Sequence, residues 1–306
     1  EYDRFMPHAA EKKYPPSPPG RRPRIIVLGA GLKPGVTEGA EALRPELEKH
    51  ADIVVWDMAF AADLREVDAD WVLVFGGDGS ILRAANQMGY RQRPILGVNL
   101  GRLGFLADLV PSELPAVLPQ VCAGNLSVVE HLMFECSLVR GDEVVWTELG
   151  LNETAVLGGA PFVMLAVHLY VDAQWVTTYS CDGLIVSTPV GSTAHNLSAG
   201  GPILRQDLRA FVISPISPHT LTMRPVVDSA DRVYELCVPS PNAGTHAVID
   251  GRAKGPLEAG DRLRICAAEP RFRLIEAPEH SYYRTLRQKL GWGGRFATKD
   301  ATVPDA

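Results

Sequence analysis

Short apolar segments that alternate with helical segments constrain the fold of the first hundred residues more than any other feature. The strand-like segments are residues 24–28, 52–57, 71–75 and 94–99, and the helical ones are residues 37–49 and 80–88. Strands that are apolar throughout must be buried on both faces, which is typical of a parallel sheet covered by helices. We expect Pro45 to interrupt the first helix or to begin a part of it.

The pattern changes after about residue 125, where short strand-like segments separated by turns replace the alternation. They are residues 133–139, 143–147, 153–157, 162–171, 174–179, 184–188, 211–214, 232–238, 245–249, 261–267 and 271–275. Such a density of short strands predicts two stacked sheets. The fold class is therefore α/β plus all-β, with a Rossmann-like parallel-sheet domain over residues 24–125 and a two-sheet β domain over residues 126–278.

The two ends of the chain differ from the rest. Residues 1–23 are rich in proline and lack periodic hydrophobic residues, so we expect a disordered tail. Residues 279–306 contain an amphipathic helix over 281–290, and we expect this segment to return to the N-terminal domain.

Composition excludes several classes of protein. A formal charge of −6 argues against a dedicated nucleic-acid binder, which would carry a basic surplus. The five cysteines contain no C-x-x-C pair, which favours reduced thiols in a cytoplasmic protein. The sequence shows no apolar run of about 18 residues and no secretory signal, so we expect no membrane partner.

Two glycine clusters follow predicted strands. Gly29-Ala30-Gly31 imitates a dinucleotide fingerprint, but Pro34 occupies the third glycine position, and a tight turn is the better interpretation. Gly76-Gly77-Asp78-Gly79 lies between a strand and a helix, where backbone N–H groups can approach phosphate oxygens. An aspartate among phosphates must bind Mg²⁺ or accept a proton from a hydroxyl nucleophile, and both roles belong to phosphoryl transfer.

This loop resembles that of a superfamily containing NAD kinases, diacylglycerol and sphingosine kinases, and 6-phosphofructokinases. The segments downstream are similar to NAD kinases in particular, and in the order of that family. They are Asn99–Leu106, Leu151–Glu153, Asp182–Pro202, Pro215–Leu221 and Leu286–Trp292. By this resemblance the sequence is identified as a member of the NAD kinase family.

The resemblance implies an enzyme that transfers the terminal phosphoryl group of ATP to the 2′-hydroxyl of the adenosine ribose of NAD. It implies Mg²⁺ or another divalent cation, carried mainly by the ATP phosphates, and a homodimer or homotetramer. Asp78 would act as the general base or would position the metal. Asn152 and Glu153 would bind the ribose diol, and Asp182 would bind the nicotinamide end of NAD in its own or a neighbouring subunit.

The resemblance also implies further nucleotide-binding residues, in addition to Asp78, Asn152, Glu153 and Asp182. They are the loop glycines Gly76, Gly77 and Gly79, together with Phe105, Ser180, Thr193, Ala194, His195, Asn196, Ser198 and Arg252. Some positions depart from the family: His195 is usually Tyr, Val190 is commonly hydroxylated, Ser180 is often Arg, and Arg252 is often Gln. We interpret His219 as a buried structural histidine.

Two other functions remain as alternatives. A lipid kinase would share the Gly-Gly-Asp-Gly loop but would lack the later segments. A catalytically silent NAD-binding sensor would have lost Asp78 or a glycine beside it, and all are present. The sequence leaves open whether NADH is accepted, whether polyphosphate replaces ATP, and which effectors act.

Overall fold

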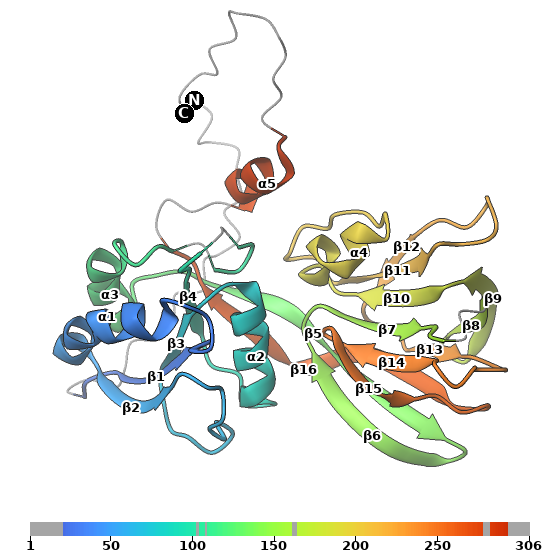
Figure 1. The fold of residues 1–306 in the computed structure, drawn as a ribbon, viewed down its shortest axis with the longest axis horizontal. Coiled ribbons are helices and arrows are strands. Elements are labelled where there is room, and N and C mark those ends of the chain that lie inside the picture. Colours follow the sequence, from blue (N-terminus) through green and yellow to red (C-terminus); the bar gives the residue numbers. More distant parts are fainter. Residues whose placement is uncertain (1–20, 102–103, 108, 161–163, 278–281, 293–306) are drawn as a thin grey trace, which may run out of the picture.

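The fold is given by a computed structural model, which describes residues 21–101, 104–107, 109–160, 164–277 and 282–292 (Figure 1). Most of the predicted N-terminal tail, residues 1–20, lies outside the described residues. The same is true of residues 278–281 and 293–306 in the C-terminal segment.

The N-terminal part is a parallel sheet with helices on both faces. Its strands follow the order β2-β1-β3-β4, and each neighbouring pair is parallel. They are β1 (Arg24–Gly29), β2 (Asp52–Asp57), β3 (Trp71–Phe75) and β4 (Ile95–Val98). The helices are α1 (Val36–His50), α2 (Asp78–Met88) and α3 (Leu114–Cys122).

Successive residues of the buried strands face opposite helices. Ile25 of β1 packs in the core that contains Leu47 of α1, whereas Ile26 packs in the core that contains Ile81 of α2. Because side chains alternate across a strand, residues of both parities must be apolar when both faces are covered. Burying each such side chain contributes about 1.5–3 kcal/mol. The predicted parallel-sheet unit is confirmed.

Helix α1 runs through Pro45 without a break, which corrects the expectation for this proline. Proline removes one backbone N–H donor from the helix. However, Val36, Ala40 and Leu47 are buried along one face, and packing of that face stabilises the helix despite the lost hydrogen bond. The sequence does not predict α3, because prolines near its start and inside it obscure the helical period.

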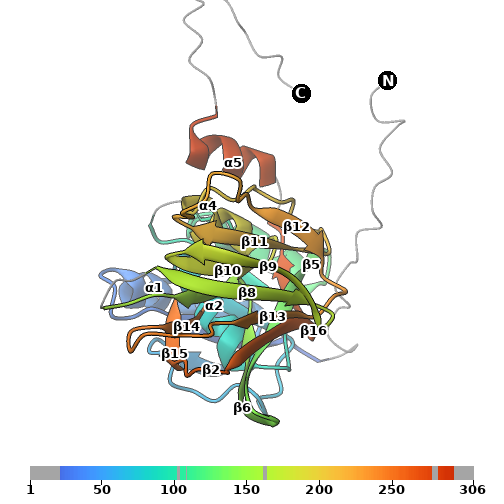
Figure 2. The ribbon, with the colours of Figure 1, turned by 90° about the vertical axis from the view of Figure 1, so that its right-hand side faces the viewer.

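The C-terminal part consists of antiparallel strands in two layers (Figure 2). The first layer has the order β12-β11-β10-β7-β14-β15. Its strands are β7 (Glu153–Leu157), β10 (Gly183–Ser187), β11 (Ala210–Ile216), β12 (Val226–Ser229), β14 (His246–Ile249) and β15 (Arg252–Pro256). The second layer contains β5 (Val128–Arg140), β6 (Glu143–Gly150), β8 (Leu165–Val171), β9 (Gln174–Cys181), β13 (Tyr234–Cys237) and β16 (Arg262–Ile275).

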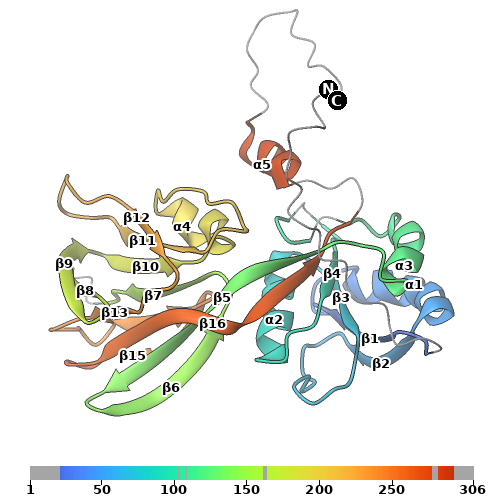
Figure 3. The same cartoon turned by 180° about the vertical axis from the view of Figure 1, so that it is seen from behind.

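Two long strands, β5 and β16, join the parallel sheet to the second layer (Figure 3). The start of β16 pairs with β13, and its end pairs with β4, where Leu274 lies opposite Ile95. Over the described residues the result is one continuous sheet of ten strands. β16 is a single strand with an irregularity between Ala267 and Arg271, where the sequence predicts the gap between two strands.

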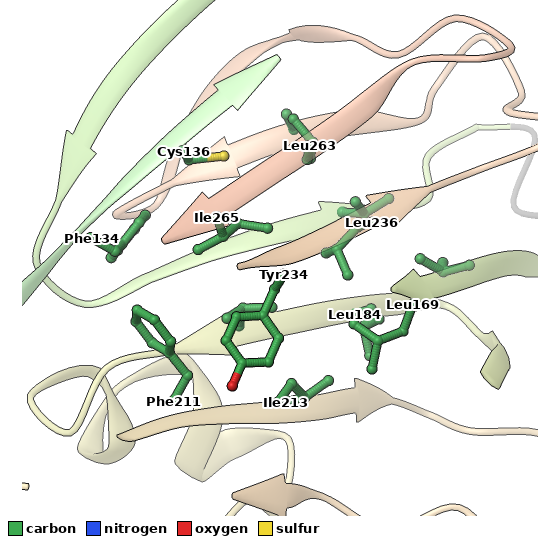
Figure 4. Close-up of a cluster of buried hydrophobic side chains, with 14 of the residues drawn as sticks. Phe134, Cys136, Leu169, Leu184, Phe211, Ile213, Tyr234, Leu236, Leu263 and Ile265 are labelled. Carbon is green, nitrogen blue, oxygen red and sulfur yellow. The ribbon is translucent and has the colours of Figure 1, made fainter. Parts of the chain in front are cut away.

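The two antiparallel layers enclose an apolar core (Figure 4). Phe211 of β11 and Tyr234 of β13 meet edge to face, with ring centroids 5.6 Å apart. The Tyr234 hydroxyl donates a hydrogen bond of 2.6 Å to the carbonyl of Ser229, so its polar atom is satisfied inside the core. The predicted two-sheet β domain is confirmed.

The last described helix, α5 (Tyr282–Leu290), lies over the junction between the two parts (Figures 1 and 3). The Tyr282 hydroxyl donates to the carbonyl of Leu204 at 2.9 Å, and Lys289 Nζ lies 3.8 Å from Asp78 Oδ2. The helix therefore contacts both parts. Within the ranges that the structure describes, every helix is too short or too polar to cross a membrane.

Candidate active site

The glycine-rich turn after β3 leads directly into α2. Gly76 has a φ of 145°, which favours glycine, and its N–H donates to the carbonyl of Val98 in β4 at 2.9 Å. A Cβ at Gly76 would lie 2.2 Å from Ser80 Oγ, whereas a Cβ at Gly77 or Gly79 would meet nothing within 4 Å. Gly77 and Gly79 thus border open space at a helix N-terminus, which suits the predicted contact with phosphates.

The Asp78 carboxylate holds a neighbouring loop in place. Oδ2 accepts a hydrogen bond from the N–H of Phe105 at 2.8 Å, and Oδ1 accepts from Leu106 at 2.9 Å and from Ala107 at 3.2 Å. About 31% of the side chain remains exposed. A carboxylate offers about four acceptor positions, so roughly one is left for a hydroxyl group or a metal ion.

Gly104 allows this close approach. A Cβ at Gly104 would lie 2.1 Å from Asp78 Oδ1 and 2.9 Å from the carbonyl oxygen of Ala107. At Gly101, three residues earlier, the nearest atom to such a Cβ is Asn99 Oδ1 at 3.9 Å, an ordinary contact. The second glycine of the Asn99–Leu106 segment is therefore required by the position of Asp78.

A second carboxylate, Asp250, organises the backbone of the predicted ribose-binding pair. Its Oδ1 accepts hydrogen bonds from the N–H of Asn152 at 2.8 Å and of Glu153 at 3.3 Å, and both oxygens accept from the N–H of Leu151. Asn86 of α2 donates to Asp250 Oδ2 at 3.3 Å. Asp250 thus connects the last turn of α2 to the start of β7.

The Glu153 carboxyl is buried and lacks one partner. Only 6% of the residue is exposed, and Oε2 has no hydrogen-bond partner among the described residues. Burial, followed by the nearby charge of Asp250, raises the pKa of Glu153 to about 8. At neutral pH the group is therefore mainly a neutral acid that can both donate and accept a hydrogen bond. A ligand hydroxyl would satisfy an atom whose isolation costs on the order of 1–3 kcal/mol.

The segment after β10 packs directly on this pair. A Cβ at Gly191 would lie 2.1 Å from the carbonyl oxygen of Asn152, so only glycine fits there. Thr193 donates its hydroxyl hydrogen to the carbonyl of Val190 at 3.2 Å. Val190, at a commonly hydroxylated position, is buried in the apolar core shared with α2. Next to Thr193, Ala194 is half-buried.

The short helix α4 (His195–Ser198) carries three predicted nucleotide contacts with different exposure. His195 is half-buried and Ser198 is exposed, so both have surface for a ligand. Asn196 is fully buried: its amide donates to the carbonyls of Ser192 and Pro202, and its oxygen accepts from the Ser214 hydroxyl at 2.6 Å. These bonds give Asn196 a structural task, while its contact with a nucleotide stays a prediction.

Asp182 and Ser180 lie away from this cluster. Ser187, at the end of β10, pairs with Glu153, whereas Asp182 directly precedes the start of β10. Asp182 is therefore roughly 17 Å from Glu153 along the strand direction. His219 is half-exposed, with Nε2 3.4 Å from Asp182 Oδ1, and its N–H donates to the Ser180 carbonyl. The expectation of a buried His219 is therefore wrong, because a carboxylate partner keeps this polar side chain at the surface.

Arg252 lies at the start of β15 and lines a cavity of about 260 Å³ beside α2. The same cavity is lined by Arg83, whose guanidinium lies 4.5 Å from the ring centroid of Phe60. Glu148 lines it too, so two guanidinium groups and a carboxylate border the same cavity. The predicted residue Phe105 does not line this cavity, and Lys289 Nζ lies 4.3 Å from its ring centroid.

Two residues of the site are missed by sequence reasoning. In the sequence, Asp250 is recognised only as part of a turn before Arg252. The Asp-Gly pair is nevertheless a turn signal, both residues have positive φ, and an aspartate in such a turn can bond nearby backbone N–H groups. Lys289 belongs to a helix that is predicted from the spacing of its apolar residues alone. That spacing does not indicate which residues the Lys289 ammonium contacts.

The chain matches two family models and several known proteins. The ATP-NAD kinase N-terminal domain model matches residues 37–126, and the ATP-NAD kinase C-terminal domain model matches residues 151–277. An NAD kinase of Rhodopirellula baltica is 54% identical over 280 residues, 92% of this chain and 90% of that protein. An NAD kinase of Geotalea daltonii is 39% identical over 269 residues, 88% of this chain and 91% of that protein.

Solved structures share the fold. A yeast NADH kinase complexed with NADH has a TM-score of 0.83 at 21% identity, covering 92% of this chain and 94% of that one. An NAD kinase from Archaeoglobus fulgidus in complex with ATP has a TM-score of 0.72 at 27% identity, covering 89% of this chain and 100% of that one.

Proposed function

The chain belongs to the NAD kinase family, and from this premise we propose how its residues transfer the terminal phosphoryl group of ATP to NAD. The observation that carries the proposal is that α2 connects both groups: Asp78 lies at its N-terminus, and the Asn152–Glu153 pair is tied to the same helix through Asp250 and Asn86.

The adenosine ribose of NAD binds at Asn152 and Glu153. Glu153 Oε2 is buried without a partner, and the Asp250 carboxylate fixes the backbone of both residues. A ribose hydroxyl can accept from the neutral Glu153 carboxyl or donate to it. Thr193, Ala194, His195 and Ser198 then contribute from the adjoining segment.

The phosphates bind over Gly77 and Gly79, whose missing Cβ atoms leave open space at the α2 N-terminus. Asp78 accepts the proton of the 2′-hydroxyl as that oxygen bonds to phosphorus, and the bond from phosphorus to ADP breaks. The loop N–H groups orient the carboxylate for this step.

A divalent cation such as Mg²⁺ is also proposed, carried mainly by the ATP phosphates. The described residues contain no cluster of three or more His, Cys, Asp or Glu side chains suited to a metal ion. Asp78 offers about one open acceptor position, which fits a cation held chiefly by substrate oxygens, as is common for Mg²⁺.

The position of Asp182 supports a role at the other end of NAD. It is roughly 17 Å from the level of Glu153 along β10 and is exposed. We propose that it binds the nicotinamide end, in its own subunit or across the contact of a homodimer or homotetramer. A cytoplasmic location is proposed as well, and the five free cysteines support it.

The experiment is an assay of the purified chain with ATP, Mg²⁺ and NAD, coupled to an NADP-specific dehydrogenase. We expect NADP formation that depends on both substrates. NAD binding without any NADP would instead support the silent sensor, and phosphorylation of diacylglycerol in place of NAD would support the lipid kinase.

A further inference from the structure

We propose that Lys289 of α5 is a catalytic residue that binds the phosphoryl group during its transfer beside Asp78. The inference rests on the proposed function and adds a residue from the C-terminal helix to it. Lys289 Nζ lies 3.8 Å from Asp78 Oδ2 and 4.3 Å from the centroid of the Phe105 ring. Asp78 belongs to the glycine turn, and its Oδ2 accepts a hydrogen bond from the Phe105 N–H.

The ion pair of Lys289 with Asp78 is a long one, so the ammonium can bind a third group beside the carboxylate. A separation of 3.8 Å exceeds the usual length of a charge-assisted hydrogen bond, which is about 2.7–2.9 Å. About 28% of the Lys289 side chain and 31% of the Asp78 side chain are exposed, and such a pair adds little to folding stability. The ammonium has three donors, none of which is committed to a short bond with this carboxylate.

The aromatic ring of Phe105 fixes where the charge lies. A cation near a ring face is attracted to it without using its N–H donors for conventional hydrogen bonds. Phe105 itself is positioned by the bond from its N–H to Asp78 Oδ2. The carboxylate, the ring and the ammonium are therefore held as one unit at the N-terminus of α2.

Helix α5 is fastened to the other part of the molecule. The Tyr282 hydroxyl bonds the Leu204 carbonyl at 2.9 Å, and the Leu204 N–H bonds Ser192 Oγ at 3.0 Å. Leu286 of the helix is 3% exposed, so the helix is packed as well as hydrogen-bonded. Lys289 thus reaches Asp78 from a support that is tied to the segment next to Asn152.

The chemistry at this point needs a cation. In the transfer step the hydroxyl proton passes to Asp78, the new oxygen–phosphorus bond forms, and the electrons of the breaking bond leave with ADP. The transferred group is negatively charged throughout, and beside it the anionic Asp78 would repel it. An ammonium between them offsets that repulsion where the charge develops.

The test compares Lys289→Met with Lys289→Arg and with Arg287→Met, a matched loss of charge at an exposed position of the same helix. We expect Lys289→Met to lower kcat by roughly 10²-fold, as for the loss of one donor at a transition state. The Kd for NAD, measured by calorimetry, should stay within about threefold, and Lys289→Arg should recover activity to within about tenfold of the parent.

The outcomes separate this inference from the proposed function. An active parent with Lys289→Met within about threefold in kcat would overturn the role of Lys289 and leave the NAD kinase assignment intact. An equal loss in Arg287→Met would also overturn it, because it would indicate a general effect of helix charge. A parent inactive on NAD would contradict the proposed function itself.

Discussion

Asp78 combines two tasks in one side chain, since it anchors three backbone N–H groups and faces the proposed site. Asp78→Asn removes the charge and the basicity, and its amide NH₂ cannot accept from the loop. We expect kcat to fall by roughly 10²–10⁴ if Asp78 is the base. NAD affinity should change much less. Steady-state kinetics and calorimetry check both, and a kcat within about threefold of the parent would exclude the assigned role.

A substitution at Gly104 tests the position of the Asp78 carboxylate separately from its chemistry, because it disturbs the loop and leaves the carboxylate in place as a chemical group. In Gly104→Ala the new Cβ would lie 2.1 Å from Asp78 Oδ1, so the carboxylate or the loop must shift. Displacement of a catalytic group by about 1 Å can cost roughly 10² in rate, and we expect a loss of that order in kcat.

Gly101→Ala is the matched control, since its Cβ would meet only Asn99 Oδ1 at 3.9 Å. It should change kcat by less than about twofold. Similar rates for Gly104→Ala and Gly101→Ala would show that the position of Asp78 does not depend on this loop.

At the scale of the element, the turn from β3 into α2 contains glycines with different tasks. Gly77→Ala and Gly79→Ala enter open space, so thermal unfolding should be unchanged while the KM for ATP rises by about tenfold or more, equivalent to 1.4 kcal/mol. Gly76→Ala combines a φ of 145° with a collision at Ser80, and it should lose about 1–3 kcal/mol of stability. An unfolding shift at Gly77 equal to that at Gly76 would contradict the proposed phosphate contact.

The same elements show what sequence can predict. Continuous apolar runs such as Trp71–Phe75 predict a strand covered on both faces, because local period and burial agree there. The prediction fails for α3, which contains two prolines, and for β12 and β15, which are half-buried or exposed. Their formation depends on pairing with distant strands, a contact that no local pattern records.

The candidate site divides in the same way. Motifs predict which residues lie near the nucleotide, and the structure places Asp78, Asn152 and Glu153 around α2. Gly104 and Asp250 are needed because of contacts between segments far apart in sequence. Gly104 lies against Asp78, and Asp250 binds a backbone segment about a hundred residues before it. Such contacts follow only from the folded chain.

At the scale of the whole molecule, a series of hydrogen bonds and one ion pair runs around the junction of the two parts, beginning and ending at α2. Asn86 of α2 bonds Asp250, and Asp250 bonds the backbone at Asn152. The carbonyl of Asn152 accepts from the next segment, which is tied through Leu204 to α5 and so back to Asp78. Both parts therefore hold the site.

Two buried titratable groups make folding stability depend on pH in opposite directions. Burial raises the pKa of Glu153 to about 8, so the folded chain keeps a proton that the unfolded chain has lost above pH 4.5, and stability falls as pH rises toward 8. Burial lowers the pKa of His131 to about 4, so the unfolded chain takes up a proton below pH 6.5, and stability falls as pH drops.

Between about pH 4.5 and 6.5 these two slopes, each about 1.36 kcal/mol per pH unit, oppose each other in the parent. Relative to the parent, the stability of Glu153→Gln should therefore rise with pH between about 4.5 and 8, whereas that of His131→Gln should fall with pH up to about 6.5. Urea unfolding of the parent and both variants from pH 4.5 to 8.5 measures these difference curves, in which groups that do not interact with Glu153 or His131 cancel. Parallel curves for all three proteins would show that neither group changes its protonation on folding, and Glu153 would then enter the reaction as a carboxylate rather than as a neutral acid.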